Sequence, residues 1–509
     1  MRRLRAVVRI ECALSSVMRC CLVRGGSADC NECDCLQAVA TEWFGNGIPP
    51  PVGGRLEFLQ DSAMSETHAL VDLHGMGGAA HTYHVHRIPV QPMLQFPCTG
   101  DAVGGHYNPW NTESGEVHPN QTAPATQDQF QVGDLSGKYG VLDDLLSVKE
   151  VHNDTNLPMF GVNSILGRSI VIHKKHSGER WACSSIGWGW DPDEARQVTA
   201  IASFHHPNGF AWGYIRFSQV VYNDGSQTET VIQVRLKHPG KTNKEQTDGH
   251  DWAIWVNPVG HDAAIKPKIA RCTAGGYRWN PTFIQLADPN DHGFYSEQCG
   301  RETPLRCEVG DLSGRHGKIS VGGRAFVFSD ANLPLHGDWF HNAIGKSIHI
   351  KDADGSPLAC ANIEPDKDII KYAVIRTLSG FNLAQFMEEV QTVMGVPDWF
   401  LFTDSRETKS LHEGKCLQIL LHFRGPLANK LEQDFSVLLR TGKLASPSLA
   451  PPGYLPPPNT PRKLPYRECG TKSSFDRKQQ LAGLYGGGAA SVGLGRAIAL
   501  PVLLLLVRR

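Results

Sequence analysis

An internal repeat with an interval of about 177 residues constrains the fold of this chain more than any other feature. Three short motifs each occur twice and in the same order: GDLSG (133–137 and 310–314), D-x-N-L-P (154–158 and 330–334) and G-x-S-I (167–170 and 345–348). Cys98 and Cys183 are echoed by Cys272 and Cys360. The 509 residues therefore contain two copies of one domain, with enough chain left over for a third.

Each copy consists of short runs in which apolar and polar residues alternate, separated by Gly, Pro and Asp. Examples are residues 55–59, 69–73, 169–173 and 230–236. This spacing, without a long helical period, predicts a Greek-key β-barrel or β-sandwich. We place the two domains at residues 51–195 and 200–368.

The pattern changes after the second copy. Helical spacing occurs at 381–394 and 427–439, and strand patterns at 398–403 and 416–423. We therefore predict a small α/β domain at residues 372–450. The chain as a whole is expected to be mainly β.

The two ends have a different composition. Residues 1–50 form a poorly defined segment, basic and partly apolar, in which charges interrupt the apolar core of a signal peptide. Residues 451–485 predict a Pro-rich stalk. Residues 486–509 contain small residues, a spacer and an apolar run too short to span a bilayer, which is typical of a glycosylphosphatidylinositol attachment signal. A buried C-terminal strand is the alternative.

Charge and cysteine content bear on partners and location. Lys and Arg total 50 and Asp and Glu total 51, so the global charge does not favour nucleic acid as a partner. From Cys98 onward the cysteines are sparse and even in number, which indicates disulfides and secretion. Cys299 and Cys307 are close enough to close a small loop. Glycosylation sequons at Asn120 and Asn153 agree with an extracellular protein.

Four histidines and one arginine in the first copy form a candidate metal site. His84 and His86 share one face of a predicted strand, because side chains alternate along a strand. His106 lies in the loop sequence GGHYNP and His173 ends the strand sequence GRSIVIH, with Arg180 shortly after it. An isolated His-x-His is a weak signal, and the other residues are what make this one informative.

Through these motifs and the two cysteines, residues 52–190 resemble the copper/zinc superoxide dismutase family. The tandem copies, the degenerate second copy, the α/β unit and the anchor signal resemble more narrowly the copper-only superoxide dismutase repeat proteins of animals. The resemblance implies one copper ion with four imidazole ligands, His84, His86, His106 and His173. It also implies that Arg180 draws superoxide to the metal and that disulfides join Cys98 to Cys183 and Cys272 to Cys360. Imidazole suits both oxidation states of copper, and a guanidinium attracts a small anion.

A zinc site is not expected. Of the zinc ligands that the resemblance implies, His106 and Asp134 are present. Gln131 replaces a third, and Ser114 replaces the fourth unless His118 substitutes after a loop shift. Two or three ligands make a poor zinc site. Without zinc, the second ring nitrogen of His106 is free to carry a proton, and we predict that His106 supplies it during turnover.

The second copy has lost the copper ligands. Aligned by motif, Trp255 and Asn257 stand opposite His84 and His86, while Arg278, Lys351 and Pro357 stand opposite His106, His173 and Arg180. These residues are poor copper ligands or none. The second copy is therefore predicted to be a structural spacer or a binding module.

The sequence thus predicts an extracellular, cell-surface superoxide dismutase that is held to the membrane by a lipid anchor. A single copper ion in the first copy would convert two superoxide ions and two protons to dioxygen and hydrogen peroxide. Two alternatives stay open: a non-catalytic cell-surface module for copper binding or adhesion, and a copper carrier without fast turnover. No protein partner of the second copy or of the α/β unit is indicated.

Overall fold

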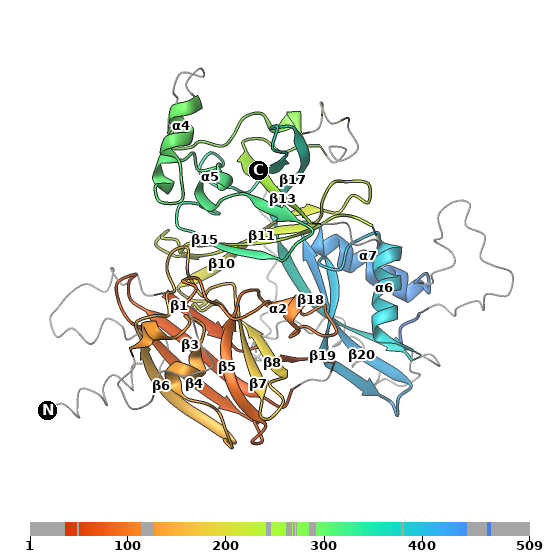
Figure 1. The fold of residues 1–509 in the computed structure, drawn as a ribbon. Helices are drawn as coiled ribbons and strands as arrows, with labels where there is room; N and C mark the ends of the chain where they lie inside the picture. Colours follow the sequence, from red (N-terminus) through yellow and green to blue (C-terminus); the bar gives the residue numbers. More distant parts are fainter. Residues whose placement is uncertain are drawn as a thin grey trace, which may run out of the picture.

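The computed structural model describes residues 36–47, 50–112, 126–240, 246–260, 267, 270, 272–284, 292–377, 381–444 and 466–469. In Figure 1 the first repeat is at the lower left, the second repeat above it, and the α/β unit beside them. The prediction of a mainly β chain is confirmed. The proposed anchor signal at 486–509, most of the N-terminal segment and most of the Pro-rich stalk lie outside the described residues.

The first repeat is built from two antiparallel sheets. Its strands are β1 (Leu36–Ala40), β2 (Phe44–Gly45), β3 (Gly53–Gln60), β4 (Thr67–His74), β5 (Ala80–His86), β6 (Ser147–Asp154), β7 (Ser169–Lys174), β8 (Arg180–Ser185) and β9 (Gly187–Trp188). One sheet has the order β6-β4-β3-β1-β9 and the other β2-β8-β7-β5. The connecting loops contain α2 (Gly100–Val103), a 3-10 turn (Gln127–Gln129) and α3 (Leu135–Tyr139). Residues 36–45, which the sequence analysis left in the N-terminal segment, form β1 and β2.

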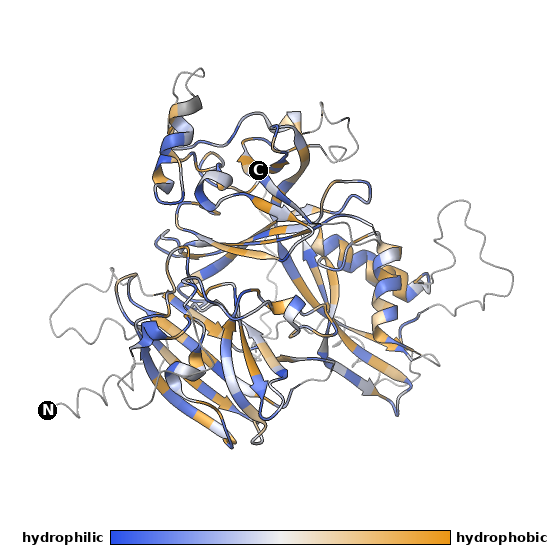
Figure 2. Ribbon diagram, viewed as in Figure 1, coloured by the Kyte–Doolittle hydropathy of each residue, from blue (hydrophilic) through white to orange (hydrophobic). Residues whose placement is uncertain are grey.

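Strand alternation explains how the two sheets share a core. Leu56 and Phe58 of β3 pack in the same cluster as Ile170 and Ile172 of β7. Buried and less buried residues alternate along β3, whereas β7 is apolar on both faces from Ile170 to Ile172, and both strands can be followed in Figure 2. The intervening Val171 faces the other way. It packs against a second cluster of Phe44, Val90, Cys98, Ala102, Val103 and Cys183.

A disulfide joins Cys98 to Cys183. It ties the loop that contains α2 to β8, across the outer face of the β2-β8-β7-β5 sheet. The loop therefore covers one end of that face and leaves the neighbouring part of β5 and β7 for polar side chains.

The second repeat forms one eight-stranded sheet, because β10 pairs with β17 at Ala200↔Pro365. Its order is β14-β13-β16-β17-β10-β11-β12-β15. The strands are β10 (Ala195–Phe204), β11 (Trp212–Tyr222), β12 (Thr230–Lys237), β13 (Thr247–Trp255), β14 (Ile319–Val321), β15 (Phe326–Asp330), β16 (Ser347–Lys351) and β17 (Pro357–Pro365). Helical turns are η4 (Thr273–Gly275), α4 (His292–Gln298), η5 (Pro304–Arg306) and α5 (Leu312–His316). Disulfides join Cys272 to Cys360 and Cys299 to Cys307.

The α/β unit has the sheet order β18-β20-β19, with strands β18 (Lys367–Arg376), β19 (Leu401–Leu411) and β20 (Cys416–Gly425). Helices α6 (Leu383–Met394) and α7 (Ala428–Thr441) pack against it through Phe386, Phe435 and Phe423. Asn382 caps α6 by accepting a hydrogen bond from the Gln385 amide, and Gly395 ends the helix in a left-handed conformation (φ 67°). A fourth disulfide joins Cys416 to Cys469.

The α/β unit contacts both repeats. Trp399 packs against Ile201 and Tyr214 of the second repeat and donates a hydrogen bond to Ser203. The guanidinium of Arg406 lies 3.8 Å from the ring centroid of Phe44 in the first repeat. The three units therefore meet in one place.

Among the helices in the described residues, none is both long enough and apolar enough to cross a bilayer.

Candidate metal centre

The four candidate histidines lie on the outer face of the β2-β8-β7-β5 sheet. His84 and His86 are on β5, where they pair with Val171 and Ser169 of β7. Val85 between them points into the core, so both imidazoles face outward. His173 ends the outward-facing series on β7, and His106 follows α2 and bridges to His86.

The structure brings one ring nitrogen of each imidazole within 4.8 Å of the others. The rings of His84 and His106 stack with centroids 4.0 Å apart, and the His173 centroid lies 5.2 Å from that of His84. His86 completes the group at 5.0 Å from His106 and 5.7 Å from His173. All four are buried or half-buried.

Two backbone carbonyls orient the rings. The carbonyl oxygen of Gly104 accepts from His86 Nδ1 at 3.0 Å, and that of Gly178 accepts from His173 Nδ1 at 2.9 Å. A carbonyl only accepts, so Nδ1 carries the proton in each ring and Nε2 presents a lone pair. Nε2 of His86 and of His173 are buried without a hydrogen-bond partner, and so is Nδ1 of His84.

The electrostatic environment keeps these imidazoles neutral. Burial lowers the pKa of His86 to about 3, and burial together with the neighbouring imidazoles places the pKa of His84 far below its ordinary value. The pKa values of His106 and His173 are also lowered, chiefly by burial. Neutral imidazoles with converging, unpartnered lone pairs are what a late first-row metal ion requires, so the residues fit a copper ion.

The candidate zinc residues have other partners in the structure. The Asp134 side chain caps α3 by accepting from the Gly137 amide at 2.8 Å, and it lies 3.5 Å from His84 Nε2. The Gln131 side chain hydrogen-bonds His106. Ser114 and His118, the remaining positions considered for zinc, lie outside the described residues.

Arg180 lies at the rim of the histidine group. It begins β8 opposite His173, and its Nη2 donates to the Gly104 carbonyl at 3.2 Å. The same carbonyl therefore holds both His86 and Arg180. A Cβ at position 100 would lie 2.6 Å from Nη1 of Arg180. Gly100 therefore lets the α2 loop approach the guanidinium closely.

Gly104 and Gly178 hold the rings of His86 and His173, and the sequence analysis did not identify them because they act through the backbone. Both have left-handed backbone conformations (φ 76° and 65°), which glycine adopts without strain. A glycine two residues before His106, and another in the turn after His173, are the sequence signals that could have indicated them.

The second repeat does not align with the first as its sequence motifs suggested. Ser136 of GDLSG accepts from the Tyr83 amide, and the equivalent Ser313 accepts from the Trp252 amide. Likewise the amides of Val85 and Ile254 donate to the carbonyls of Gly133 and Gly310. The positions equivalent to His84 and His86 are therefore Ala253 and Trp255. The alignment of Trp255 and Asn257 with the two histidines is wrong by two residues, although neither alignment restores a ligand.

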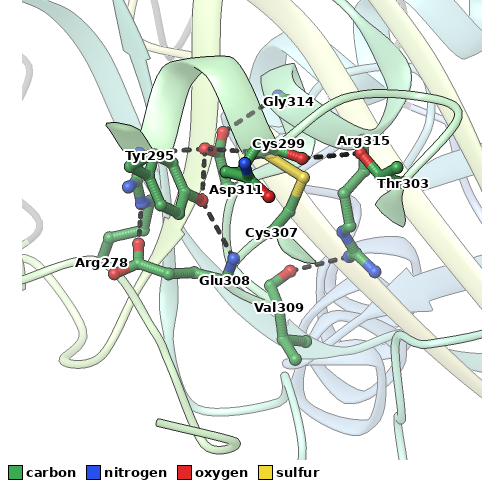
Figure 3. The surroundings of a disulfide bond; sticks show 11 residues. Arg278, Tyr295, Cys299, Thr303, Cys307, Glu308, Val309, Asp311, Gly314 and Arg315 are labelled. Atoms are coloured by element: carbon green, nitrogen blue, oxygen red, sulfur yellow. Dashed lines mark hydrogen bonds and ion pairs between the residues drawn. A yellow bond between two sulfur atoms is a disulfide. The ribbon is translucent and has the colours of Figure 1, made fainter. Parts of the chain in front are cut away.

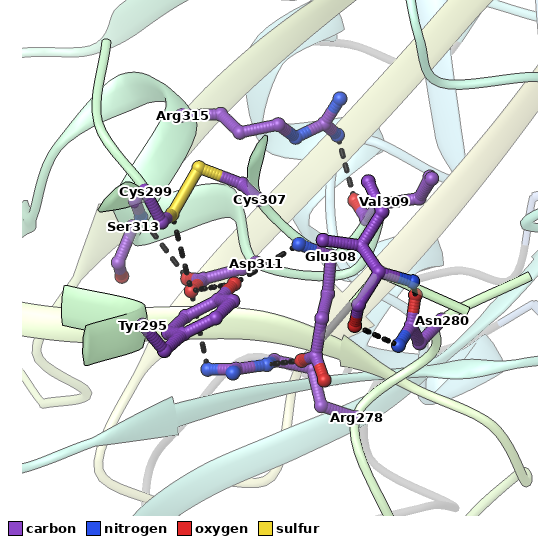
Figure 4. Close-up of polar contacts among 12 residues, drawn as sticks. Arg278, Asn280, Tyr295, Cys299, Cys307, Glu308, Val309, Asp311, Ser313 and Arg315 are labelled. Atoms are coloured by element: carbon purple, nitrogen blue, oxygen red, sulfur yellow. Dashed lines mark hydrogen bonds and ion pairs between the residues drawn. A yellow bond between two sulfur atoms is a disulfide. The ribbon is translucent and has the colours of Figure 1, made fainter. Parts of the chain in front are cut away.

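An ion-pair network occupies the corresponding region of the second repeat (Figure 3). Arg278, at the position of His106, pairs with Glu308 and lies 3.2 Å from Asp311. Glu308 and Asp311 stand at the positions of Gln131 and Asp134. Tyr295 of α4 donates to Asp311 at 2.9 Å and accepts from the Glu308 amide at 3.0 Å (Figure 4). The Cys299–Cys307 disulfide holds α4 against this network.

Aromatic stacking fills the remainder of that face. The Trp255 ring stacks on His349 with centroids 4.6 Å apart, and the Lys351 ammonium lies 4.4 Å from the Trp255 centroid. Cations therefore occupy two of the four ligand positions in the second repeat.

Comparison with known proteins identifies relatives of the first repeat. The family model for copper/zinc superoxide dismutase (SODC) matches residues 52–186. The Cu-Zn superoxide dismutase of Schizosaccharomyces pombe is 32% identical over 123 residues, covering 24% of this chain and 70% of the relative. Cell surface superoxide dismutase [Cu-Zn] 4 of Candida albicans is 31% identical over 97 residues, covering 19% of this chain and 36% of the relative. The Cu(II) structure of superoxide dismutase 5 from Candida albicans matches with a TM-score of 0.23 and 23% identity, covering 33% of this chain and 93% of that one.

Proposed function

Because this chain belongs to the copper/zinc superoxide dismutase family, we propose that its first repeat is a copper-dependent superoxide dismutase. The reaction converts two superoxide ions and two protons to dioxygen and hydrogen peroxide. The observation that carries the proposal is the convergence of unpartnered nitrogens on His84, His86 and His173, with His106 beside them. When bound there, copper would supply one-electron redox chemistry by alternating between two oxidation states.

Arg180 is assigned the attraction and orientation of superoxide. Its guanidinium is only partly buried, and the Gly104 carbonyl fixes it at the rim of the histidine group. A fixed cation beside the site raises the local concentration of a small anion and orients it without closing the site.

His106 is assigned the delivery of a proton. It is the only one of the four histidines on a loop rather than a strand, and its hydrogen-bond partner is a side chain, Gln131. The ring of His106 is therefore held by a side chain, whereas backbone carbonyls hold the rings of His86 and His173. We propose a site with copper alone, because Asp134 is engaged as a helix cap and glutamine is a poor zinc ligand.

The protein is proposed to work outside the cell, at the cell surface. Four disulfides in the described residues favour an oxidising compartment. Asn153, one of the two sequons, is exposed at the end of β6, which agrees with a glycosylated protein. The attachment by a glycosylphosphatidylinositol anchor depends on residues 486–509 and is a proposal from the sequence alone.

The test uses the full chain produced in an oxidising host. Elemental analysis is expected to find one copper per chain, negligible zinc, and superoxide dismutation that His173→Ala abolishes. His74→Ala, an exposed histidine at the end of β4, is the matched control and should change neither copper content nor rate.

Copper bound without turnover would support the copper carrier instead. If the wild-type chain binds no copper, the non-catalytic adhesion module is the remaining alternative.

A further inference from the structure

A cleft of about 270 Å³ lies where the first repeat, the second repeat and the α/β unit meet. The first repeat contributes residues 88–93, in the loop after β5, and residues 185–188. The second repeat contributes side chains of β10, β11 and β12, and the α/β unit contributes Arg424 of β20. The cleft is separate from the histidine group, which does not line it.

The charged residues that line this cleft are all arginines: Arg216, Arg235 and Arg424. No Asp, Glu or Lys is among the described residues of its wall. Arg216 lies 2.7 Å from Asp366, and Arg424 lies 3.5 Å from both Asp366 and Asp368. Two carboxylates behind the wall therefore face three guanidiniums.

Arg235 has the weakest compensation of the three. Its hydrogen-bond partner is the neutral Tyr214, and the acid near it is Asp398, whose pKa burial raises. Burial lowers the pKa values of both Arg235 and Arg424, and the charge of Arg216 lowers them further. Asp366 raises the pKa of Arg216, so Arg216 keeps its charge and repels Arg235 and Arg424 in a poorly solvated place. An anion between these cations would relieve that repulsion.

Unpartnered donors accompany the excess positive charge. Three side chains of the wall each have a buried N–H without a hydrogen-bond partner: Gln91 Nε2, Trp188 Nε1 and Arg216 Nη2. Trp188 is 4% exposed and Gln91 8%. A buried donor without a partner destabilises the folded chain, so native proteins contain few of them. Their presence around one cleft indicates a ligand rich in acceptor atoms.

The remaining wall is apolar. Ile88, Pro92 and Met93 of the first repeat line the cleft together with Val231 and Phe326 of the second repeat. An inorganic ion alone would leave this surface unused. We propose that the cleft binds an organic oxyanion, whose phosphate or sulfate group pairs with the arginines and whose apolar part packs on residues such as Ile88 and Phe326.

The proposal is tested by calorimetric titration of the full chain at constant ionic strength. Phenyl phosphate and phenyl sulfate are the probes, with inorganic phosphate as the anion alone and benzyl alcohol as the apolar part alone. We expect one saturable site per chain for at least one of the two aryl oxyanions. Inorganic phosphate and benzyl alcohol should each bind more weakly. The preferred probe distinguishes a phosphate ligand from a sulfate ligand.

Arg235→Gln is expected to weaken that binding by about tenfold or more, since it removes a charge-assisted hydrogen bond. Arg196→Gln, an exposed arginine on β10 outside the cleft, is the matched control and should leave affinity unchanged. Superoxide dismutation should be equal in both variants. Equal affinity in the two variants, or no saturable binding by any probe, would overturn the proposal.

Hydrogen exchange of the wild-type chain provides a second measurement that does not depend on a variant folding. The bound probe should protect amides in residues 88–93 and in β11. Protection confined to other segments would refute the cleft as the binding site.

Discussion

Replacing Asp154 by Asn is expected to destabilise the first repeat by about 3–5 kcal/mol. The Asp154 carboxylate lies 2.5 Å from the Lys138 ammonium, and both side chains are fully buried. It also accepts from the Tyr139 hydroxyl and from the Asn156 amide, each at 2.7 Å. An amide at this position cannot balance the ammonium charge. Its NH₂ group would also put a hydrogen-bond donor where the carboxylate now has an acceptor oxygen. Lys138 would keep only its hydrogen bond to the Val132 carbonyl.

The assay is differential scanning calorimetry of the full chain at constant pH and copper loading. For a domain of this size the transition of the first repeat should fall by roughly 10 °C. Asp72→Asn is the control, because Asp72 pairs with Lys149 on the surface at 3.2 Å and should contribute less than about 1 kcal/mol. The double variant Lys138→Met/Asp154→Asn removes the uncompensated charge and should recover part of the loss. The reasoning is refuted if Asp154→Asn lowers the stability no more than Asp72→Asn does. It is also refuted if the double variant is less stable than Asp154→Asn alone.

Three further predictions concern the site and its counterpart. Arg180→Gln should lower kcat/KM for superoxide by about tenfold and make it less dependent on ionic strength, as measured by stopped-flow kinetics. The copper content should not change. An unchanged salt dependence would contradict the steering role. Arg278→Met should cost the second repeat about 2–4 kcal/mol in calorimetry, because it leaves the carboxylates of Glu308 and Asp311 without their cation, while the dismutation rate stays the same. Burial lowers the pKa of His349 from 6.5 to about 3, so the unfolded chain binds the additional proton between these values. The stability of the second repeat should therefore fall as the pH falls from about 6.5 toward 3. Urea titrations should show a smaller fall in His349→Gln, and equal slopes would count against this explanation.

Local rules place the histidines of β5 and β7, whereas His106 lies on a loop and was assigned to the group only through the family resemblance. His84 and His86 lie on one face because a strand alternates, and His173 continues the outward series of β7. The helices of the α/β unit could be predicted because their apolar spacing has a helical period. Contacts through the backbone could not be predicted, since the carbonyl of Gly104 has no signature of its own in the side-chain pattern.

The error in the second repeat has a physical cause. The shared Val suggested that Val256 matches Val85, whereas the structure gives that place to Ile254. The core requires an apolar residue there and does not distinguish Val from Ile. Similarly, β1 was overlooked although Leu36, Ala38 and Ala40 alternate with less buried residues, because a run of only five residues with a single polar side chain is a weak pattern.

The Cys98–Cys183 bond has a consequence for how the enzyme would mature. It closes a span of 85 residues between the loop that carries Gly104 and the strand that begins at Arg180. In a thiol-rich compartment this bond would be reduced. The loop that carries the Gly104 carbonyl, which His86 and Arg180 share, would then no longer be linked to β8. Translation alone would then yield a dormant chain. Passage into an oxidising compartment would complete the site, so the place of synthesis would be protected from a premature source of hydrogen peroxide.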